Sequence, residues 1–121
     1  MIWEEIRIVG LDAKKTEPLD DASGFRRMFL QISSLPTKEW INIFINERSF
    51  PRHNMWRRAW IEGLYIVVDC VPEEIGQYHL RDLKEDVANT NAKYDTYLRL
   101  VQAENKRLQA EKALRRKNLQ T

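Results

Sequence analysis

The fold is decided by residues 72–118, which read PEEIGQYHLRDLKEDVANTNAKYDTYLRLVQAENKRLQAEKALRRKN. Pro72 suits the first position of a helix, because its missing N–H has no intrahelical partner there, and the glutamates that follow match the positive end of the helix dipole. No proline follows in this stretch, and Gly76 is its one glycine. A helix of about 46 residues would be roughly 69 Å long, more than a domain of this size can cover. We therefore expect a long C-terminal helix whose distal half projects or finds a partner.

The main alternative is a break at Asn89-Thr90-Asn91, where polar side chains compete for the backbone hydrogen bonds. With or without the break, the sequence predicts one domain with an extension. Residues 1–71 form an α+β body, and residues 72–121 form the helix. We expect the proximal half of the helix to pack on the body and the distal half to resemble a coiled coil.

Seven residues of this helix recur at alternating spacings of four and three, the heptad pattern of a coiled coil. This predicted oligomer seam consists of Val87, Asn91, Tyr94, Leu98, Val101, Asn105 and Leu108. Lys112 and Arg115 continue the spacing with polar side chains. A buried asparagine in such a seam specifies register and partner number at a cost in stability. We expect the proximal part of the row to cover the sheet, together with Leu80 and Leu83, and the distal part to contact a partner.

The basic residues are concentrated at the end of the chain. Residues 72–105 contain four basic and seven acidic residues, whereas residues 106–121 contain six basic and one acidic. This gradient matches the helix dipole, and it favours antiparallel over parallel pairing of two such helices. Both orientations remain open from the sequence.

The first part of the body predicts two strands separated by a loop. Ile2, Ile6 and Ile8 alternate with charged residues and predict one strand, and residues 25–33 predict the next, with Met28 and Leu30 on the same face. Residues 12–24 between them are rich in turn-forming residues and predict a loop.

The rest of the body predicts a helix and then one or two strands. Pro36 suits the first turn of a helix that we expect to be largely buried, given its apolar residues Trp40, Ile41, Ile43, Phe44 and Ile45. Residues 56–61 and 64–70 predict two strands around a two-residue turn at Glu62-Gly63, or one continuous strand through Gly63. The order of elements predicts the α+β class, with an antiparallel sheet of three or four strands, a buried helix and the long C-terminal helix.

A second group of residues interleaves cations with aromatic rings, as in surfaces that bind phosphates and stack bases. These possible nucleic-acid contacts are Arg52, Trp56, Arg57 and Arg58, with Trp60 beside them, and Lys106, Arg107, Lys112, Arg115, Arg116 and Lys117 in the tail. On a strand, Trp56, Arg58 and Trp60 would share one face. The alternative is that the tryptophans belong to the core and that the tail is a solvated helix end.

No motif for catalysis or cofactor binding is present in the sequence. His79, Asp82 and Asp86 fall on one helical face at spacings that could hold a metal, although a surface cluster is the more common arrangement. Cys70 is expected to be a small core residue with neither histidine near it. We therefore expect neither an enzyme nor a bound cofactor or metal.

A single cysteine, Cys70, excludes an intrachain disulfide, and the acidic N-terminus lacks the features of a signal peptide. The longest apolar run, residues 64–68, is far too short to span a bilayer. The sequence thus predicts a cytoplasmic protein-protein interaction module. It would form a homodimer or higher oligomer, or join another helical protein, through the C-terminal helix, and binding to nucleic acid is the alternative function.

Overall fold

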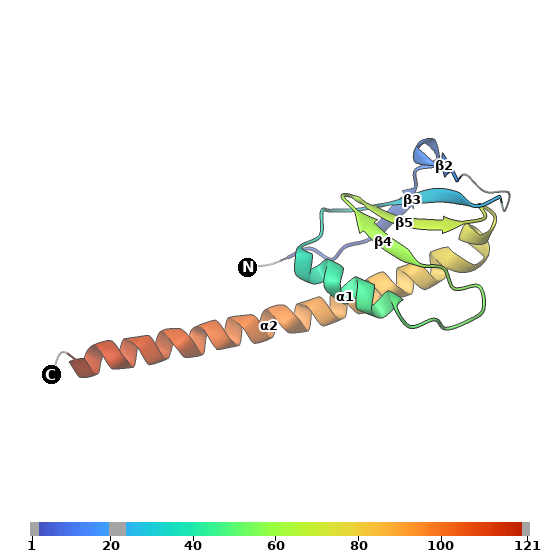
Figure 1. Cartoon of the computed structure of the whole chain (residues 1–121). Coiled ribbons are helices and arrows are strands. Elements are labelled where there is room, and N and C mark those ends of the chain that lie inside the picture. The colour runs from blue at the N-terminus through green and yellow to red at the C-terminus, as the bar shows by residue number, and fades with distance from the viewer. Residues whose placement is uncertain (1–2, 20–23, 120–121) are drawn as a thin grey trace.

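The computed structural model describes residues 3–19 and 24–119, and it confirms the α+β class. A small antiparallel sheet lies on a short helix and on a long C-terminal helix that extends well beyond the body (Figure 1). The strands are β1 (Ile8–Leu11), β2 (Glu17–Pro18), β3 (Arg26–Ile32), β4 (Ala59–Glu62) and β5 (Tyr65–Cys70). The helices are the 3₁₀ turn η1 (Ala13–Lys15), α1 (Lys38–Arg48), the π turn η2 (Ile75–His79) and α2 (Leu80–Leu119).

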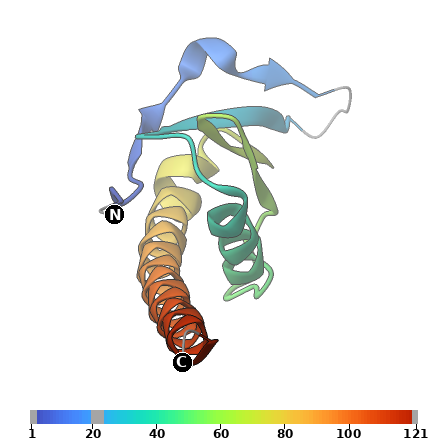
Figure 2. The same ribbon diagram turned by 90° about the vertical axis from the view of Figure 1, so that its left-hand side faces the viewer.

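The sheet has the order β1-β3-β5-β4, and β2 also pairs with β3. Met28 and Leu30 of β3 pair with Val68 and Ile66 of β5, and all four side chains are buried. Because alternate residues of a strand point to one face, these residues form the upper layer of the core. Figure 2 shows α1 and α2 side by side beneath that face.

The predicted first strand is displaced. β1 begins at Ile8, and the preceding Ile6 is buried but lies outside the strand. Its backbone N–H donates to Oδ1 of Asn91 at 3.2 Å, and its carbonyl accepts from Nδ2 of the same side chain at 2.8 Å. The amide thus occupies the backbone groups that a neighbouring strand would need, while Ile2 lies outside the described residues.

The structure describes residues 12–19 and 24 of the segment predicted as a loop. Residues 12–19 lie over the face of the sheet that points away from α1 and α2. They contain η1 and β2, and the ammonium of Lys15 lies 5.0 Å from the ring centre of Phe29 and 4.6 Å from that of Tyr65. The hydroxyl of Tyr65 donates to Asp12 at 3.1 Å. These contacts explain how Phe29 is buried on the side of the sheet away from the helices.

A hairpin joins β4 and β5, which excludes one continuous strand. Glu62 pairs with Tyr65, so the two loop residues are Gly63 and Leu64 rather than the expected Glu62 and Gly63. Gly63 has φ +57° at the first loop position, which is where a type II′ turn requires glycine. β4 starts only at Ala59, so Trp56 precedes the strand and does not share a strand face with Trp60.

Helix α1 is less buried than expected. Thr37 caps it by accepting a hydrogen bond from the backbone N–H of Trp40 at 3.2 Å, and Pro36 precedes the cap. Its buried residues are Trp40, Phe44 and Arg48, spaced four apart on one stripe, while Ile45 is exposed. The helix therefore contributes one stripe to the core instead of being enclosed.

Helix α2 runs without interruption to Leu119, so the break considered at Asn89-Asn91 does not occur. Asn91 and Thr90 are both buried and hydrogen-bonded, Thr90 to the carbonyl of Asp86 at 2.7 Å. Leu83, Val87 and Tyr94 complete the core from below. Tyr94 is the last buried residue of the described helix and Leu98 still packs partly against the core, so about 21 residues, or roughly 32 Å, project from the body.

Candidate functional site

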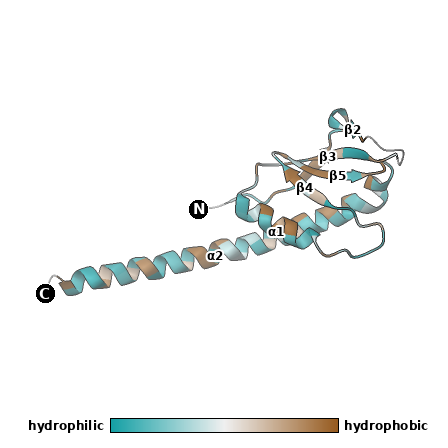
Figure 3. Ribbon diagram, viewed as in Figure 1, coloured by the Kyte–Doolittle hydropathy of each residue, from teal (hydrophilic) through white to brown (hydrophobic). Residues whose placement is uncertain are grey.

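The predicted seam passes from the core into solvent without leaving its side of the helix. Val87 and Tyr94 are buried under the body, whereas Val101 is 37% and Leu108 41% exposed. Residues seven apart return to nearly the same side of a helix, drifting by only about 20° per heptad. Figure 3 shows apolar bands that recur among hydrophilic ones along this distal half. We name the distal part of the row, Leu98, Val101, Asn105 and Leu108, the free row.

The first three seam residues are buried, as expected for the proximal part of the row, so the part of the seam that a partner could contact begins at Leu98. Oδ1 of Asn91 accepts from the indole N–H of Trp40 at 2.9 Å in addition to its two bonds with Ile6. The hydroxyl of Tyr94 accepts from Thr37 at 3.1 Å. With Val87 also buried, these residues hold the body together.

A pocket of about 270 Å³ lies where α2 leaves the body. We name it the foot pocket, and its lining includes Trp3, Glu4, Leu35, Trp40 and Tyr94. Trp3 stands edge-on to the ring of Tyr94, with centroids 4.8 Å apart, and its indole N–H donates to Asp95 at 3.3 Å. The free row therefore leads directly into an apolar pocket beside two carboxylates.

The tail of α2 presents several cations to solvent. Arg107 pairs with Glu104 at 2.7 Å and with Glu111 at 3.4 Å, and the hydrogen bonds that it donates to Glu104 raise the pKa of its guanidinium. The exposed basic residues here also include Lys106, Lys112, Arg115, Arg116 and Lys117. Electrostatic attraction from this end is available to an acidic partner surface.

The cations of the Arg52–Trp60 region, by contrast, are engaged within the body. Arg52 pairs with Glu85 at 2.8 Å and with Asp86, and Arg57 pairs with Glu74 at 3.1 Å. Arg58 lies over the ring of Trp60, 5.4 Å from its centre. The structure does not bring these residues together as a free basic surface with stacking platforms.

Trp56 lies between two guanidinium groups. The guanidinium carbon of Arg48 lies 3.6 Å from its ring centre and that of Arg52 4.5 Å away. Arg48 is buried against Asp86 at 3.1 Å, and burial lowers the pKa of Arg48 and raises that of Asp86 because desolvation outweighs their pairing. This network fastens the loop of residues 49–58 to α2.

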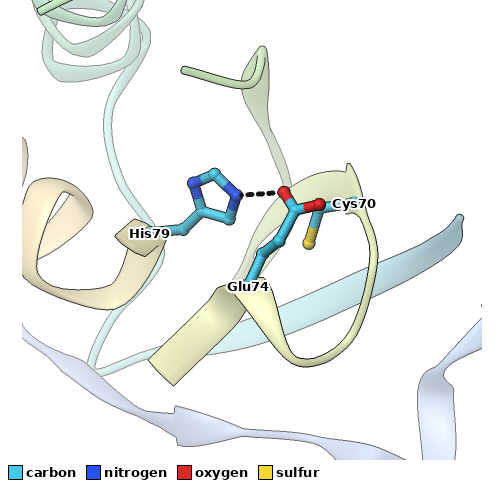
Figure 4. Close-up of side chains that lie close together, drawn as sticks. All are labelled: Cys70, Glu74 and His79. Carbon is cyan, nitrogen blue, oxygen red and sulfur yellow. Dashed lines mark hydrogen bonds and ion pairs between the residues drawn. The ribbon is translucent and has the colours of Figure 1, made fainter. Parts of the chain in front are cut away.

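A buried cluster of metal-ligand types lies at the start of the helical region: Cys70, Glu74 and His79 (Figure 4). One potential ligand atom of each residue lies within 4.8 Å of the others, and Nε2 of His79 lies 2.8 Å from Oε1 of Glu74. The carboxylate of Glu74 also accepts two hydrogen bonds from Arg57, at 3.1 and 3.3 Å. Burial raises the pKa of the Cys70 thiol to about 12, so the thiolate that a metal requires is not preformed.

The cluster is therefore charge-balanced by Arg57 and fits an internal network better than a metal centre. Nδ1 of His79 has no hydrogen-bond partner among the described residues, whereas metal-binding imidazoles use that second nitrogen as a donor. The residues that the sequence suggested as a metal site, His79, Asp82 and Asp86, contact different partners. Asp82 pairs with His53 at 2.5 Å, and Asp86 pairs with arginines. Cys70 is a core residue as expected, and the fold brings His79 close to it although no motif in the sequence does so.

Sequence reasoning missed the contact between Glu74 and His79 because it assumed α-helical geometry. Residues five apart are about 140° apart around an α-helix. The π turn η2, with its i→i+5 hydrogen bonds, brings them to the same side. No sequence pattern used above distinguishes such a turn from an ordinary helix start.

Across residues 3–19 and 24–119, every helix falls short of the combined length and apolarity that crossing a bilayer would require. Comparison of the chain with protein-family models, with curated proteins and with solved structures finds no match. The free row and the foot pocket of this chain are accordingly the features from which its function is proposed.

Proposed function

We propose that this chain is a non-catalytic assembly module that associates with a second copy of itself through the free row of α2. One observation carries the proposal: the face of the helix that builds the core continues through the partly buried Leu98 into solvent, where Val101 and Leu108 hold the same heptad position as Val87 and Tyr94. A spacer helix surrounded by solvent does not need an apolar face that continues beyond the body. A helix that pairs with another helix needs one.

The energetics of the row alone favour weak association. Each apolar side chain that passes from full exposure to full burial contributes about 1.5–3 kcal/mol, and the free row offers three per copy that are already more than half covered. The six side chains therefore contribute roughly 4–7 kcal/mol, which is set against an association cost of about 4–15 kcal/mol. A dimer at micromolar concentration therefore requires further contacts between the two copies.

Asn105 would restrict the geometry of the pair. It is an exposed polar residue between Val101 and Leu108, and pairing would place its amide in the seam. A single asparagine at such a position limits the alternative registers and oligomers at a cost in affinity. Association through the free row would thus be selective rather than strong.

The test is the molar mass of the full chain in solution, measured by light scattering over a concentration series. We expect a dimer at micromolar concentration, and separate Val101→Lys and Leu108→Lys variants should be monomers. Leu100→Lys is the matched control, because Leu100 is 66% exposed and adjacent in sequence but lies off the row. A monomeric parent chain, or equal behaviour of all three variants, would contradict the proposal.

A further inference from the structure

The geometry points to an antiparallel pair, in which the basic end of each α2 is seated against the foot pocket of the other copy. The inference rests on the self-association proposed above and specifies its orientation, its register and a second contact surface. Three observations support it: the side of α2 on which the body lies, the apolar residues of the free row, and the charges at the two ends of the projecting part of α2.

Orientation follows from the side of the helix that the body occupies. The heptad spacing puts the free row on the same side of α2 as Val87 and Tyr94, which are buried beneath the body. Paired helices lie 8–10 Å apart, so a parallel partner in register would enter, from Tyr94 backwards, the space that the body fills. In a parallel pair, the two bodies would also lie at the same end of the pair and on the side where the helices meet, so each would occupy the other's space. An antiparallel pair places the two bodies at opposite ends.

The register follows from the apolar residues. Antiparallel seams alternate the two heptad positions across the interface, which sets Leu98 opposite Leu108 of the second copy and Val101 opposite its Asn105. If the two helices were shifted by one heptad so that the bodies moved apart, Leu98 would face Arg115 and the contact between Leu98 and Leu108 would be lost. Sliding inward by one heptad would set Leu108 opposite the buried Asn91 and would press a further heptad of the second helix against the body.

In this register the row of the first copy is open only as far as Tyr94, which Lys112 of the second copy would face, so residues 113–119 would leave the row there and meet the body at the foot pocket. Among the described lining residues, Glu4 is the one with a charge, and Asp95, which accepts a hydrogen bond from the lining residue Trp3, is paired with Arg99 at 3.0 Å. The arriving segment, residues 106–119, contains six basic residues and one acidic residue. A lysine near the faces of Trp3 and Tyr94 would add cation–π attraction to this complementarity.

Pulsed electron paramagnetic resonance on spin-labelled full-length chains measures the orientation. Labels at Lys117→Cys should be separated by about 42 Å along the axis in the antiparallel register, but should lie side by side, within roughly 20 Å, in a parallel pair. Labels at Ala103→Cys lie near the centre of the overlap and should give a short distance in either case. They are therefore the control for pair formation.

A surface variant tests the contact with the pocket. Leu35 is 70% exposed at the pocket, and Leu35→Lys should repel the basic end and raise the dissociation constant of the pair at least tenfold. Phe50→Lys is the matched control, because Phe50 is 65% exposed beyond the other end of α1, and this variant should pair as the parent does. A short Lys117 distance overturns the orientation, and an unchanged affinity of Leu35→Lys overturns the pocket contact. A monomeric parent chain would instead remove the self-association on which both depend.

Discussion

Two asparagines of the heptad row, Asn91 and Asn105, show how the same residue at the same heptad position can have opposite environments. Asn91 bonds to the backbone of Ile6 and to the indole of Trp40, all within the core. Asn105 is exposed to solvent. The spacing places both on one side of the helix, but only the tertiary structure determines where the body ends. The sequence therefore predicted the row and its buried proximal part, but it could not predict the residue at which the row becomes exposed.

We predict opposite effects for leucine at these two positions. Asn91→Leu should lower the free energy of unfolding by about 2–4 kcal/mol, because it leaves a buried indole N–H and the backbone groups of Ile6 without partners. Asn105→Leu should leave unfolding of the monomer nearly unchanged and strengthen association while relaxing its specificity. Urea unfolding and a dilution series of molar mass measure the two effects. Equal stability of Asn91→Leu and the parent would contradict the role given to its hydrogen bonds.

Cys70 should be unreactive in the folded protein. A pKa of about 12 instead of about 8.5 reduces the thiolate fraction at pH 8 by roughly a thousandfold, and the side chain is also fully buried. Reaction with a coloured disulfide reagent at pH 8 should be slow in buffer and immediate in denaturant. Rapid labelling under native conditions would show that the strand end opens.

Glu74 gives a pH dependence with a definite sign. Burial alone would raise the pKa of its carboxyl, but the hydrogen bonds from Arg57 and His79 lower it overall. A carboxyl whose pKa is lower in the folded state stabilises the fold above its unfolded pKa of about 4.3, and this contribution is lost as the pH falls through the folded value. Glu74→Gln should therefore be less stable than the parent at pH 7, and the difference should shrink in acid below pH 4. A difference in melting temperature that is independent of pH would contradict this assignment.

At the scale of elements, helix α2 is two structures in one continuous helix. Its proximal part is held by tertiary contacts and its distal part only by helical hydrogen bonds and pairs such as Arg107 with Glu104. Sequence period and the absence of proline were sufficient to predict its length. The π turn before it and the displaced β1 were not predictable, because each depends on a contact between residues far apart or on a backbone geometry that leaves no period.

The boundary between the two parts can be located by truncation. Ending the chain after Arg99 should give a monomer with the parent's sheet, because it removes Val101 and Leu108 but keeps Tyr94. Ending it after Ala92 should in addition destabilise the body by about 3 kcal/mol, because Tyr94 fills the core and bonds to Thr37. Circular dichroism melts of the two truncated chains measure the difference. Equal melting would mean that Tyr94 adds nothing to the body.

At the scale of the whole molecule, the order of elements and the class of the fold were predictable, and the pairing of charges was not. Composition showed cations beside aromatics over residues 52–60, but three of those cations already have partners in the body: carboxylates for Arg52 and Arg57, and an indole for Arg58. Such pairs join segments far apart in the chain, so no local pattern predicts them. The tail remains as the surface with cations free to attract an external partner.

Binding to nucleic acid should therefore be weak and should depend on the tail alone. We expect no submicromolar affinity in fluorescence-anisotropy titrations against single-stranded and duplex oligonucleotides at physiological salt, given a net charge of +2. Removing the charges of Arg115, Arg116 and Lys117 should change pairing of the chain more than any residual binding. Tight binding that weakens steeply with salt, with a slope that falls by roughly 0.7–0.9 per charge removed, would instead favour the nucleic-acid function.

The hydrogen bonds between Asn91 and Ile6 join positions 85 residues apart, which affects the order in which the chain can fold. Loop-closure entropy must be overcome before such a distant contact contributes stability, so folding is slow when the lower layer of a core arrives last. While the chain is synthesised from its N-terminus, the strands exist before Leu83, Val87 and Tyr94 can cover them. The part of the sheet's apolar face that α2 covers therefore stays exposed until residue 94 is available, while α1 can cover the rest. A nascent chain that stalls before that point exposes an incomplete core to aggregation.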